Sequence, residues 1–231
     1  MNVVKFVKAE TNGNDFVIIN ENEKSFSDAQ KKTIADRKFG IGCDQFIFIQ
    51  NEQEKYVVDF FNQDGSHADM CGNGACAVTK YIKKTFNENS KILDLMISGK
   101  LYNVSTSEDG VTVSFDLPRE IGNVISTGNK HLVMNFSDIE NLEELVEKYP
   151  ECNLHFIEVI SSNTIKMKTF ERGVGWTLAC GSGAIAVGFY SKIKGKIKLI
   201  QDGGESIVEV FDDCVTLTTN PKLIFEGEFY E

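Results

Sequence analysis

Two cysteines, each followed by a glycine-rich turn, are the residues of this chain whose type and spacing suggest chemistry. One copy reads Cys71-Gly72-Asn73-Gly74-Ala75, and the other, 109 positions later (71 to 180), reads Cys180-Gly181-Ser182-Gly183-Ala184. Small residues that are typical of a packed helix follow each copy. A helix N-terminus lowers the pKa of a thiol placed there, and its unpaired N–H groups bind anions. The pattern predicts two thiols facing each other across one bound carboxylate.

Two opposed thiols can racemise or epimerise an amino acid without a cofactor. One thiol in its ionised form removes the α-proton, and the other delivers a proton to the opposite face. N–H groups at the helix starts, from Gly72, Asn73, Gly181 and Ser182, would stabilise the charge that flows onto the α-carboxylate. The protonation states of the two thiols are coupled, because one must be ionised while the other is not.

Other interpretations of these residues have less support. A buried cysteine is commonly an inert small hydrophobe, which is the interpretation for Cys43, Cys76, Cys152 and Cys214. Zinc is disfavoured, since there is no C-x-x-C pair and the three histidines stand apart. Neither copy contains the G-x-G-x-x-G pattern of a dinucleotide site. A disulfide between the paired cysteines is disfavoured by the reducing compartment inferred below.

Composition excludes several classes of function. The formal net charge of −10 argues against nucleic acid as a partner. No stretch approaches the roughly 18 apolar residues that span a membrane, and residues 1–20 lack the pattern of a signal peptide. The expected location is the cytoplasm, and the expected partner is a small molecule.

The first half of the chain alternates strand patterns with two helical ones. A helix is predicted over residues 27–36, with Ser25 or Ser27 as its cap, and another over 72–86. Apolar and β-branched runs predict strands at 3–8, 16–20, 46–50, 56–61, 93–97, 101–106 and 111–116.

The second half repeats this order after a boundary at Leu117-Pro118. Helices are predicted over residues 140–148 and 181–193. Strands are predicted at 123–126, 131–136, 155–160, 165–170, 197–201, 206–211 and 215–219. Phe61 matches Phe170 at the same offset as the cysteines. The chain therefore reads as a duplicated α/β unit of about 110 residues, with a functional site expected between the copies.

At these residues the sequence resembles the diaminopimelate epimerase family, in order and over nearly the whole chain. The matching stretches are Gly13-Asn14-Asp15-Phe16, Asp36-Arg37, Phe39-Gly40-Ile41-Gly42, Asp44-Gln45, Phe61-Asn62, Asp64-Gly65-Ser66, Met70-Cys71-Gly72-Asn73-Gly74, Gly128-Asn129, His131, Asn153, Glu171-Arg172-Gly173-Val174-Gly175, Thr177, Ala179-Cys180-Gly181-Ser182-Gly183 and Phe225-Glu226-Gly227.

The resemblance implies an α+β fold of two pseudo-symmetric halves, each a curved, mostly antiparallel sheet wrapped around a central helix. The halves would comprise residues 1–116, joined by a C-terminal strand at 223–231, and residues 117–222. A homodimer and an activity without a cofactor or metal are implied as well.

The resemblance also implies roles for single residues. Cys71 and Cys180 would be the acid/base pair, with His131 beside Cys71 and Glu171 beside Cys180 to tune which thiol is ionised. Without the resemblance, His131 would be an ordinary histidine and Glu171-Arg172 a solvated pair. Arg172 suits a second carboxylate, which it can bind through two hydrogen bonds. The positions that match substrate-holding residues are Asn14, Gln45, Asn62, Asn129, Asn153 and Arg172.

Five residues depart from the family pattern and bear on the substrate. Cys76 replaces an arginine, Trp176 a glutamate, Lys130 a proline, and Glu10-Thr11 a histidine-glycine pair. The retained residues favour an epimerase of LL- and meso-diaminopimelate, which belongs to the synthesis of lysine and peptidoglycan precursors. The departures leave open a racemase of another amino acid, such as histidine. A binding protein of the same fold that lacks catalysis is a third alternative.

Overall fold

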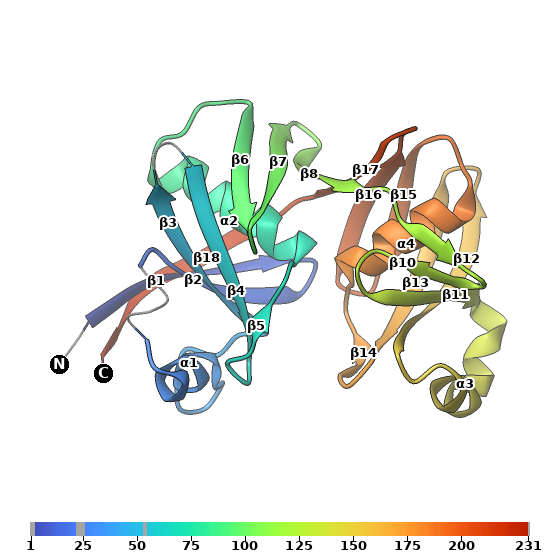
Figure 1. Ribbon diagram of the computed structural model, residues 1–231, viewed down its shortest axis with the longest axis horizontal. Coiled ribbons are helices and arrows are strands. Elements are labelled where there is room, and N and C mark those ends of the chain that lie inside the picture. The colour runs from blue at the N-terminus through green and yellow to red at the C-terminus, as the bar shows by residue number, and fades with distance from the viewer. Residues whose placement is uncertain (1–2, 22–25, 53–54, 231) are drawn as a thin grey trace. The chain divides into compact units, whose positions relative to one another are not determined.

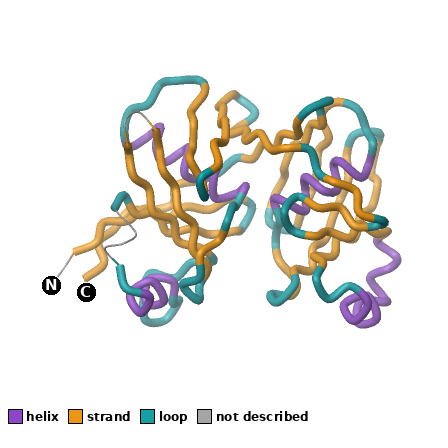
Figure 2. The backbone as a smooth tube through the Cα atoms, in the orientation of Figure 1, coloured by secondary structure: helices purple, strands orange, loops and turns teal. Residues whose placement is uncertain are grey.

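The computed structural model describes residues 3–21, 26–52 and 55–230, and Ser25, one of the two predicted caps, lies outside them. The chain divides into two compact units (Figure 1). The first comprises Met1–Val113 with Asn220–Glu231, and the second comprises Ser114–Thr219. Strands make up most of both units (Figure 2). The predicted α+β class is therefore confirmed.

The first unit is a mixed sheet with two helices. Helix α1 (Asp28–Ala35) begins at Ser27, whose side chain accepts the N–H of Gln30, and α2 (Gly72–Thr85) is the longer helix. The strands are β1 (Val3–Thr11), β2 (Asn14–Ile19), β3 (Gln45–Glu52), β4 (Lys55–Asn62), β5 (His67–Ala68), β6 (Ile92–Ile97), β7 (Lys100–Ser107), β8 (Gly110–Asp116) and β18 (Lys222–Tyr230).

The second unit has the same order of elements. Its helices are α3 (Leu142–Lys148), which follows a 3-10 turn at Phe136–Asn141, and α4 (Gly181–Ser191). Its strands are β9 (Arg119–Ile121), β10 (Val124–Ser126), β11 (Lys130–Asn135), β12 (Cys152–Ser161), β13 (Thr164–Glu171), β14 (Gly175–Thr177), β15 (Gly195–Gln201), β16 (Gly204–Val210) and β17 (Cys214–Thr219).

Strand pairing repeats between the units. β2 pairs in parallel with β3, and β4 with β6, while β1–β2, β3–β4, β4–β5 and β6–β7 are antiparallel. The second unit has the same pattern in β11–β12, β13–β15, β10–β11, β12–β13, β13–β14 and β15–β16. The duplication predicted from the motif thus extends to the whole sheet.

Three short strands and one helix start differ from prediction. β5, β9 and β14 have two or three residues, too few for a hydrophobic period to be visible. The helix predicted from residue 140 is preceded by a 3-10 turn, because the Asp138 carboxylate accepts the N–H of Asn135 and starts the turn early.

Each sheet packs its apolar face on its longer helix. Helix α2 contacts β1, β2 and β18, whereas α4 contacts β11, β12, β16 and β17 (Figure 1). Seven of the 11 residues of α4 are buried, which matches its small apolar composition. In the first unit a cluster of phenylalanines fills the space on the α1 side, where the Phe46 and Phe61 rings stack at 5.1 Å.

The last glycine of each motif is required by the sheet. A Cβ on Gly74 would lie 2.5 Å from Cε1 of Phe60, and a Cβ on Gly183 would lie 2.2 Å from Cε1 of His155. No real Cβ tolerates such contacts, so glycine lets the first turn of each helix lie directly on the strands. These two glycines therefore serve helix–sheet packing.

We expect Gly74→Ala to lower the free energy of unfolding by about 1–3 kcal/mol, because the buried Phe60 ring must move to admit the methyl group. Chemical denaturation measures the change. Lys84→Ala, at an exposed position of the same helix, is the control. Equal stability of Gly74→Ala and wild type would contradict the packing argument.

Candidate functional site

Cys71 and Cys180 occupy the N-cap positions of α2 and α4 with nearly identical geometry. Their φ/ψ values are −134°/113° and −134°/114°. In each case Sγ accepts a hydrogen bond at 3.3 Å from the N–H three residues later, on Gly74 or Gly183. Each sulfur therefore lies at the positive end of a helix dipole, where negative charge on sulfur is stabilised.

Asn14 faces the first of these cysteines. The Cys71 thiol donates to Oδ1 of Asn14 over 3.7 Å, and the Asn14 amide nitrogen donates to Oδ2 of Asp44 at 3.1 Å. Because a carboxylate only accepts hydrogen bonds, Asp44 determines which end of the Asn14 amide faces the sulfur.

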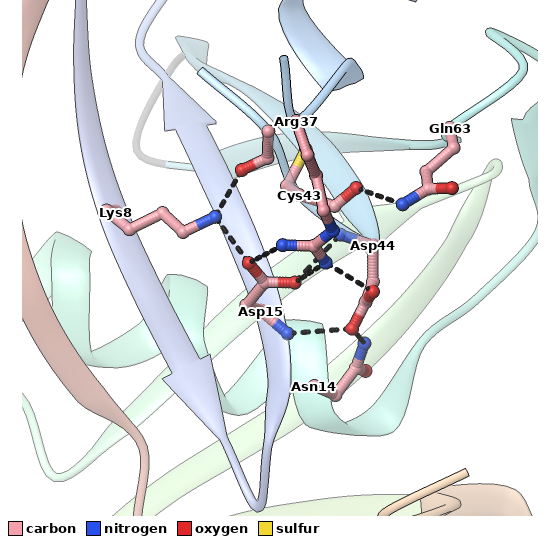
Figure 3. Close-up of polar contacts among 8 residues, drawn as sticks. Lys8, Asn14, Asp15, Arg37, Cys43, Asp44 and Gln63 are labelled. Carbon is pink, nitrogen blue, oxygen red and sulfur yellow. Dashed lines mark hydrogen bonds and ion pairs between the residues drawn. The ribbon is translucent and has the colours of Figure 1, made fainter. Parts of the chain in front are cut away.

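A cluster of charges holds Asp44 in place (Figure 3). The Arg37 guanidinium donates to both oxygens of Asp15, at 3.0 and 2.6 Å, and to Oδ1 of Asp44 at 2.7 Å. Lys8 pairs with Asp15 and with the carbonyl of Gly42. The Asp15 and Asp44 backbone N–H groups each donate to the other's carboxylate.

The cluster also controls protonation of Asp15. Burial alone would raise the pKa of Asp15, but the hydrogen bonds from Arg37 and Lys8 outweigh it and hold the pKa well below its usual range. The hydrogen bond to Asp15 in turn raises the pKa of Arg37. Asp15 and Arg37 thus stay ionised at neutral pH, and their ion pair holds the loop before β3.

Gln45 and Asn62, two predicted substrate residues, lie opposite each other on β3 and β4. The Gln45 amide nitrogen donates to Oδ1 of Asn62 at 3.0 Å, and the Asn62 amide nitrogen donates to the Ser66 hydroxyl at 3.1 Å. In the first turn of α2, Asn73 is almost fully buried, and its backbone carbonyl accepts from the Thr11 hydroxyl at 3.1 Å. Its Oδ1 has no hydrogen-bond partner among the described residues.

In the second unit, Cys180 has polar neighbours at the start of α4. Its Sγ lies 3.5 Å from the Ser182 hydroxyl, which can donate to an anionic sulfur. Its backbone N–H donates to Oε1 of the buried Gln201 at 2.9 Å. The backbone before the helix is therefore held to β15.

A polar pocket of about 420 Å³ lies within the second unit. The Asn153 side-chain oxygen accepts the backbone N–H of Arg172 at 3.0 Å, which joins β12 to the turn after β13. Lys130, a departure from the family pattern, lies 3.4 Å from the Glu151 carboxylate. Cations, carboxylates and amides together suit a zwitterionic ligand. The lining residues are Gly128, Asn129, Lys130, Glu151, Asn153, Glu171 and Arg172.

Glu171 ends β13, and its carboxylate accepts the Thr177 hydroxyl at 2.8 Å. Trp176, between Gly175 and Thr177, is 49% exposed. Its ring meets Phe170 edge-on at 5.5 Å, just as His67 meets Phe61 at 5.3 Å in the first unit. Trp176 is therefore packed on the hairpin that carries Glu171, with half of its surface in solvent.

Strand register gives the predicted residues equivalent places in the two units. Phe16 pairs with Gln45, and Gln45 with Asn62, while His131 pairs with Asn153. The β12–β13 register places Asn153 opposite Glu171, one position beyond the Leu154–Phe170 pair. The equivalent pairs are Gln45 with Asn153, Asn62 with Glu171, Phe16 with His131, and Cys71 with Cys180.

His131 is fully buried and has partners at both ring nitrogens. Nε2 lies 2.9 Å from the Thr127 hydroxyl, and Nδ1 lies 2.8 Å from Nε2 of His155. Burial lowers the pKa of His131 to about 4, and burial together with the neighbouring His131 lowers the pKa of His155 well below its usual value. The predicted effect of His131 on Cys71 stays a prediction.

Sequence reasoning missed Asp44, Thr127 and His155. Asp44 stands in the motif Asp44-Gln45, but nothing in that motif says that its carboxylate orients Asn14. Thr127 precedes the Gly128-Asn129 turn, and His155 alternates with apolar residues in a strand. Only the pairing of β11 with β12 brings the two histidines together.

Of the remaining cysteines, Cys43, Cys76 and Cys152 are buried and Cys214 is partly exposed. All six cysteines lie in the described part of the chain and are free thiols. Burial raises the pKa of Cys43 to about 12, which makes it a poor nucleophile. No group of three or more metal-ligating side chains occurs in the ranges that the structure describes. Within those same ranges no helix is long and apolar enough to cross a membrane.

Sequence comparison assigns the family. The diaminopimelate epimerase profile matches residues 6–119 and 123–222. The chain belongs to the diaminopimelate epimerase family. A diaminopimelate epimerase of Campylobacter jejuni is 31% identical over 97% of this chain and 95% of its own length. That of Carboxydothermus hydrogenoformans is 29% identical over 98% of this chain and its entire length.

Solved structures share the fold at low identity. A phenazine biosynthesis protein of the PhzF family from Bacillus anthracis has a TM-score of 0.77 at 13% identity, covering 100% of both chains. A hydroxyproline epimerase from Agrobacterium vitis has a TM-score of 0.71 at 9% identity, covering 98% of this chain and 92% of its own. With the family assignment, the protein is an isomerase of the epimerase type, in a family that acts on small-molecule amino-acid substrates.

We expect acid to destabilise the fold through the buried histidines. Their pKa values are lower in the folded state than the usual 6.5, so below pH 6.5 the unfolded chain binds protons that the folded chain does not. For His131 alone, the shift to about 4 corresponds to about 3 kcal/mol, lost as the pH falls from 6.5 to 4. Urea denaturation across this range measures it.

The double variant His131→Phe/His155→Ile, which copies the equivalent Phe16 and Ile47 of the first unit, is the comparison protein. Its stability should fall less than that of wild type between pH 6.5 and 4. An identical fall in both proteins would contradict the assignment of the acid sensitivity to this pair.

We expect Asp44→Asn to lower kcat/KM for the epimerisation at least tenfold, because an amide at this position no longer determines the orientation of Asn14. Loss of hydrogen bonds to a charged group should also lower the free energy of unfolding by about 1–3 kcal/mol. Asp212→Asn, in an exposed turn, is the control, and equal kinetics of both variants would contradict the role of Asp44.

Proposed function

We propose that this protein interconverts LL- and meso-diaminopimelate without a cofactor, with Cys71 and Cys180 as the acid/base pair. The observation that supports this most is the matched geometry of the two cysteines, each a helix N-cap whose sulfur accepts a backbone N–H. A reaction that removes a proton on one face of a carbon and adds one on the other needs two such groups.

In this mechanism, one thiolate takes the α-proton and the other thiol gives its proton to the opposite face, so the two sulfurs exchange protonation states in each turnover. The N–H groups of Gly72, Asn73, Gly181 and Ser182 would receive the α-carboxylate, because the first N–H groups of a helix lack intrahelical partners. Charge that develops on the carboxylate in the transition state is stabilised there.

The polar pocket supports a substrate with a second amino-acid end. Arg172 and Lys130 can bind the distal carboxylate, while Glu151 and the amide oxygens of Asn129 and Asn153 can accept from the distal ammonium. Asn14, Gln45 and Asn62 are proposed to contact the substrate from the first unit. His131 and Glu171 are proposed to tune Cys71 and Cys180.

A racemase of another amino acid, such as histidine, is the second candidate. The half-exposed Trp176, on the hairpin that carries Glu171, and Lys130, which lines the pocket and pairs with Glu151, support it, since Trp176 and Lys130 both depart from the family pattern.

We further propose, from the family resemblance and for the first candidate, a cytoplasmic homodimer that supplies a precursor for lysine and peptidoglycan.

Incubation of the reduced protein in D₂O with LL-diaminopimelate, meso-diaminopimelate or histidine tests the proposal. We expect α-deuterium exchange and a new stereoisomer with diaminopimelate. Cys71→Ala and Cys180→Ala should each lower the epimerisation rate at least about a thousandfold, since either change removes one of the two proton carriers.

Cys214→Ala, which alters a cysteine outside the helix starts, is the control and should keep the wild-type rate. Exchange with histidine alone would replace the first candidate by the second. Absence of exchange with every amino acid tried would exclude both candidates and favour a binding protein.

A further inference from the structure

Four side chains form a continuous hydrogen-bonded chain inside the second unit. Thr127 Oγ1 contacts Nε2 of His131 at 2.9 Å, Nδ1 of His131 contacts Nε2 of His155 at 2.8 Å, and Nδ1 of His155 contacts Oγ1 of Thr169 at 3.1 Å. His131, His155 and Thr169 are buried, whereas Thr127 is half-buried in the turn before Gly128 and Asn129.

The first unit shows that the fold does not require this chain of hydrogen bonds. Strand register makes Phe16, Ile47 and Phe60 the equivalents of His131, His155 and Thr169. All three are fully buried apolar residues, and Phe16 and Phe60 pack under Gly74 as His155 packs under Gly183. Beneath the helix that begins at Cys180, three hydrogen-bonded polar side chains thus occupy the places that three apolar side chains occupy in the first unit.

Satisfaction of the buried hydrogens determines the direction of the chain. Thr169 Oγ1 has no second hydrogen-bond partner within the described ranges. If it accepted from His155, its own hydroxyl hydrogen would be buried and unpaired, which is unfavourable. Thr169 therefore donates to Nδ1 of His155, Nε2–H of His155 donates to Nδ1 of His131, and Nε2–H of His131 donates to Thr127.

This direction leaves one hydrogen without an internal acceptor, the hydroxyl hydrogen of Thr127 at the half-buried end. Each bond polarises the next in the same sense, which makes that hydroxyl a better donor. Both imidazoles must be neutral for the chain to have a direction, and their burial keeps them so at neutral pH, because it lowers both pKa values.

We propose that Thr127 is a further substrate-binding residue, which donates a hydrogen bond to a carboxylate oxygen of the substrate beside Gly128 and Asn129, the next two residues of the chain, which line the polar pocket. His131, His155 and Thr169 are positioning residues that orient and polarise the Thr127 hydroxyl. This inference rests on the proposed function, in which the substrate carries carboxylates. It also indicates how a buried histidine with both nitrogens occupied can influence the reaction.

Nitrogen-15 NMR of the histidine rings tests the direction without any substrate. We expect His131 and His155 both to carry hydrogen on Nε2 and none on Nδ1 at pH 7.5. A hydrogen on Nδ1 of either ring would overturn the assigned direction. Because no reaction is involved, the result is independent of whether the proposed function holds.

Kinetics of Thr127→Val and Thr127→Ser test the role. Valine lacks the hydroxyl and should lower kcat/KM at least tenfold, whereas serine keeps the donor and should restore most of the rate. The loss should lie in KM rather than in kcat, because the acceptor belongs to the bound substrate. A shift of the pH profile for alkylation of Cys71 or Cys180 to higher pH would make a thiolate the acceptor and overturn the carboxylate assignment. Wild-type kinetics in Thr127→Val would also overturn the proposal.

Variants of His155 separate positioning from packing. His155→Gln can donate to His131 and accept from Thr169, so it should keep more of the rate than His155→Phe, which fills similar space without polar atoms. Thr79→Val, which removes a buried hydroxyl from α2, is the control for stability and should keep the wild-type rate. Equal rates of the Gln and Phe variants would overturn the positioning role. Loss of exchange in wild type itself would instead reject the proposed function.

Discussion

The contact of each helix's first turn with the sheet is the constraint on which the rest of the structure depends. A cysteine can serve as N-cap, with its sulfur on a backbone N–H, only if the helix begins at one defined residue, and the height of the helix above the strands then decides where that sulfur lies. Gly74 and Gly183 set that height, because any side chain there would displace Phe60 or His155. The same contact therefore places both the sulfur and the N–H groups that can bind a carboxylate.

The two units use one topology but support their cysteines differently. In the first unit an ionised cluster around Arg37 holds Asp44, which orients the Asn14 amide toward the Cys71 thiol. In the second unit the corresponding helix rests on hydrogen-bonded histidines, and Cys180 has the Ser182 hydroxyl nearby. A duplicated fold can thus give two chemically identical groups distinct surroundings, as the proposed acid/base pair would need.

The helices at the two motifs, the longer strands, the fold class and the family could be predicted from the sequence. The helices at Cys71 and Cys180 follow from small-residue runs after glycine, and the longer strands from apolar and β-branched runs. The α+β class and the family followed from motifs in their order along the chain. The roles assigned to Cys71, Cys180, His131, Glu171 and the substrate residues stay predictions, because chemistry at a site depends on distances that no motif specifies.

What the sequence by itself determined was the repeat, the kind of element at each motif, and the family, because these depend on residue type and short-range spacing. Tertiary structure alone decided which side chains meet. Strand register set Gln45 opposite Asn62 and brought His131 to His155, 24 residues further along the chain. The tertiary structure also revealed that Asn14 donates a hydrogen bond to Asp44. Because the two residues lie 30 positions apart, this bond leaves no local pattern in the sequence.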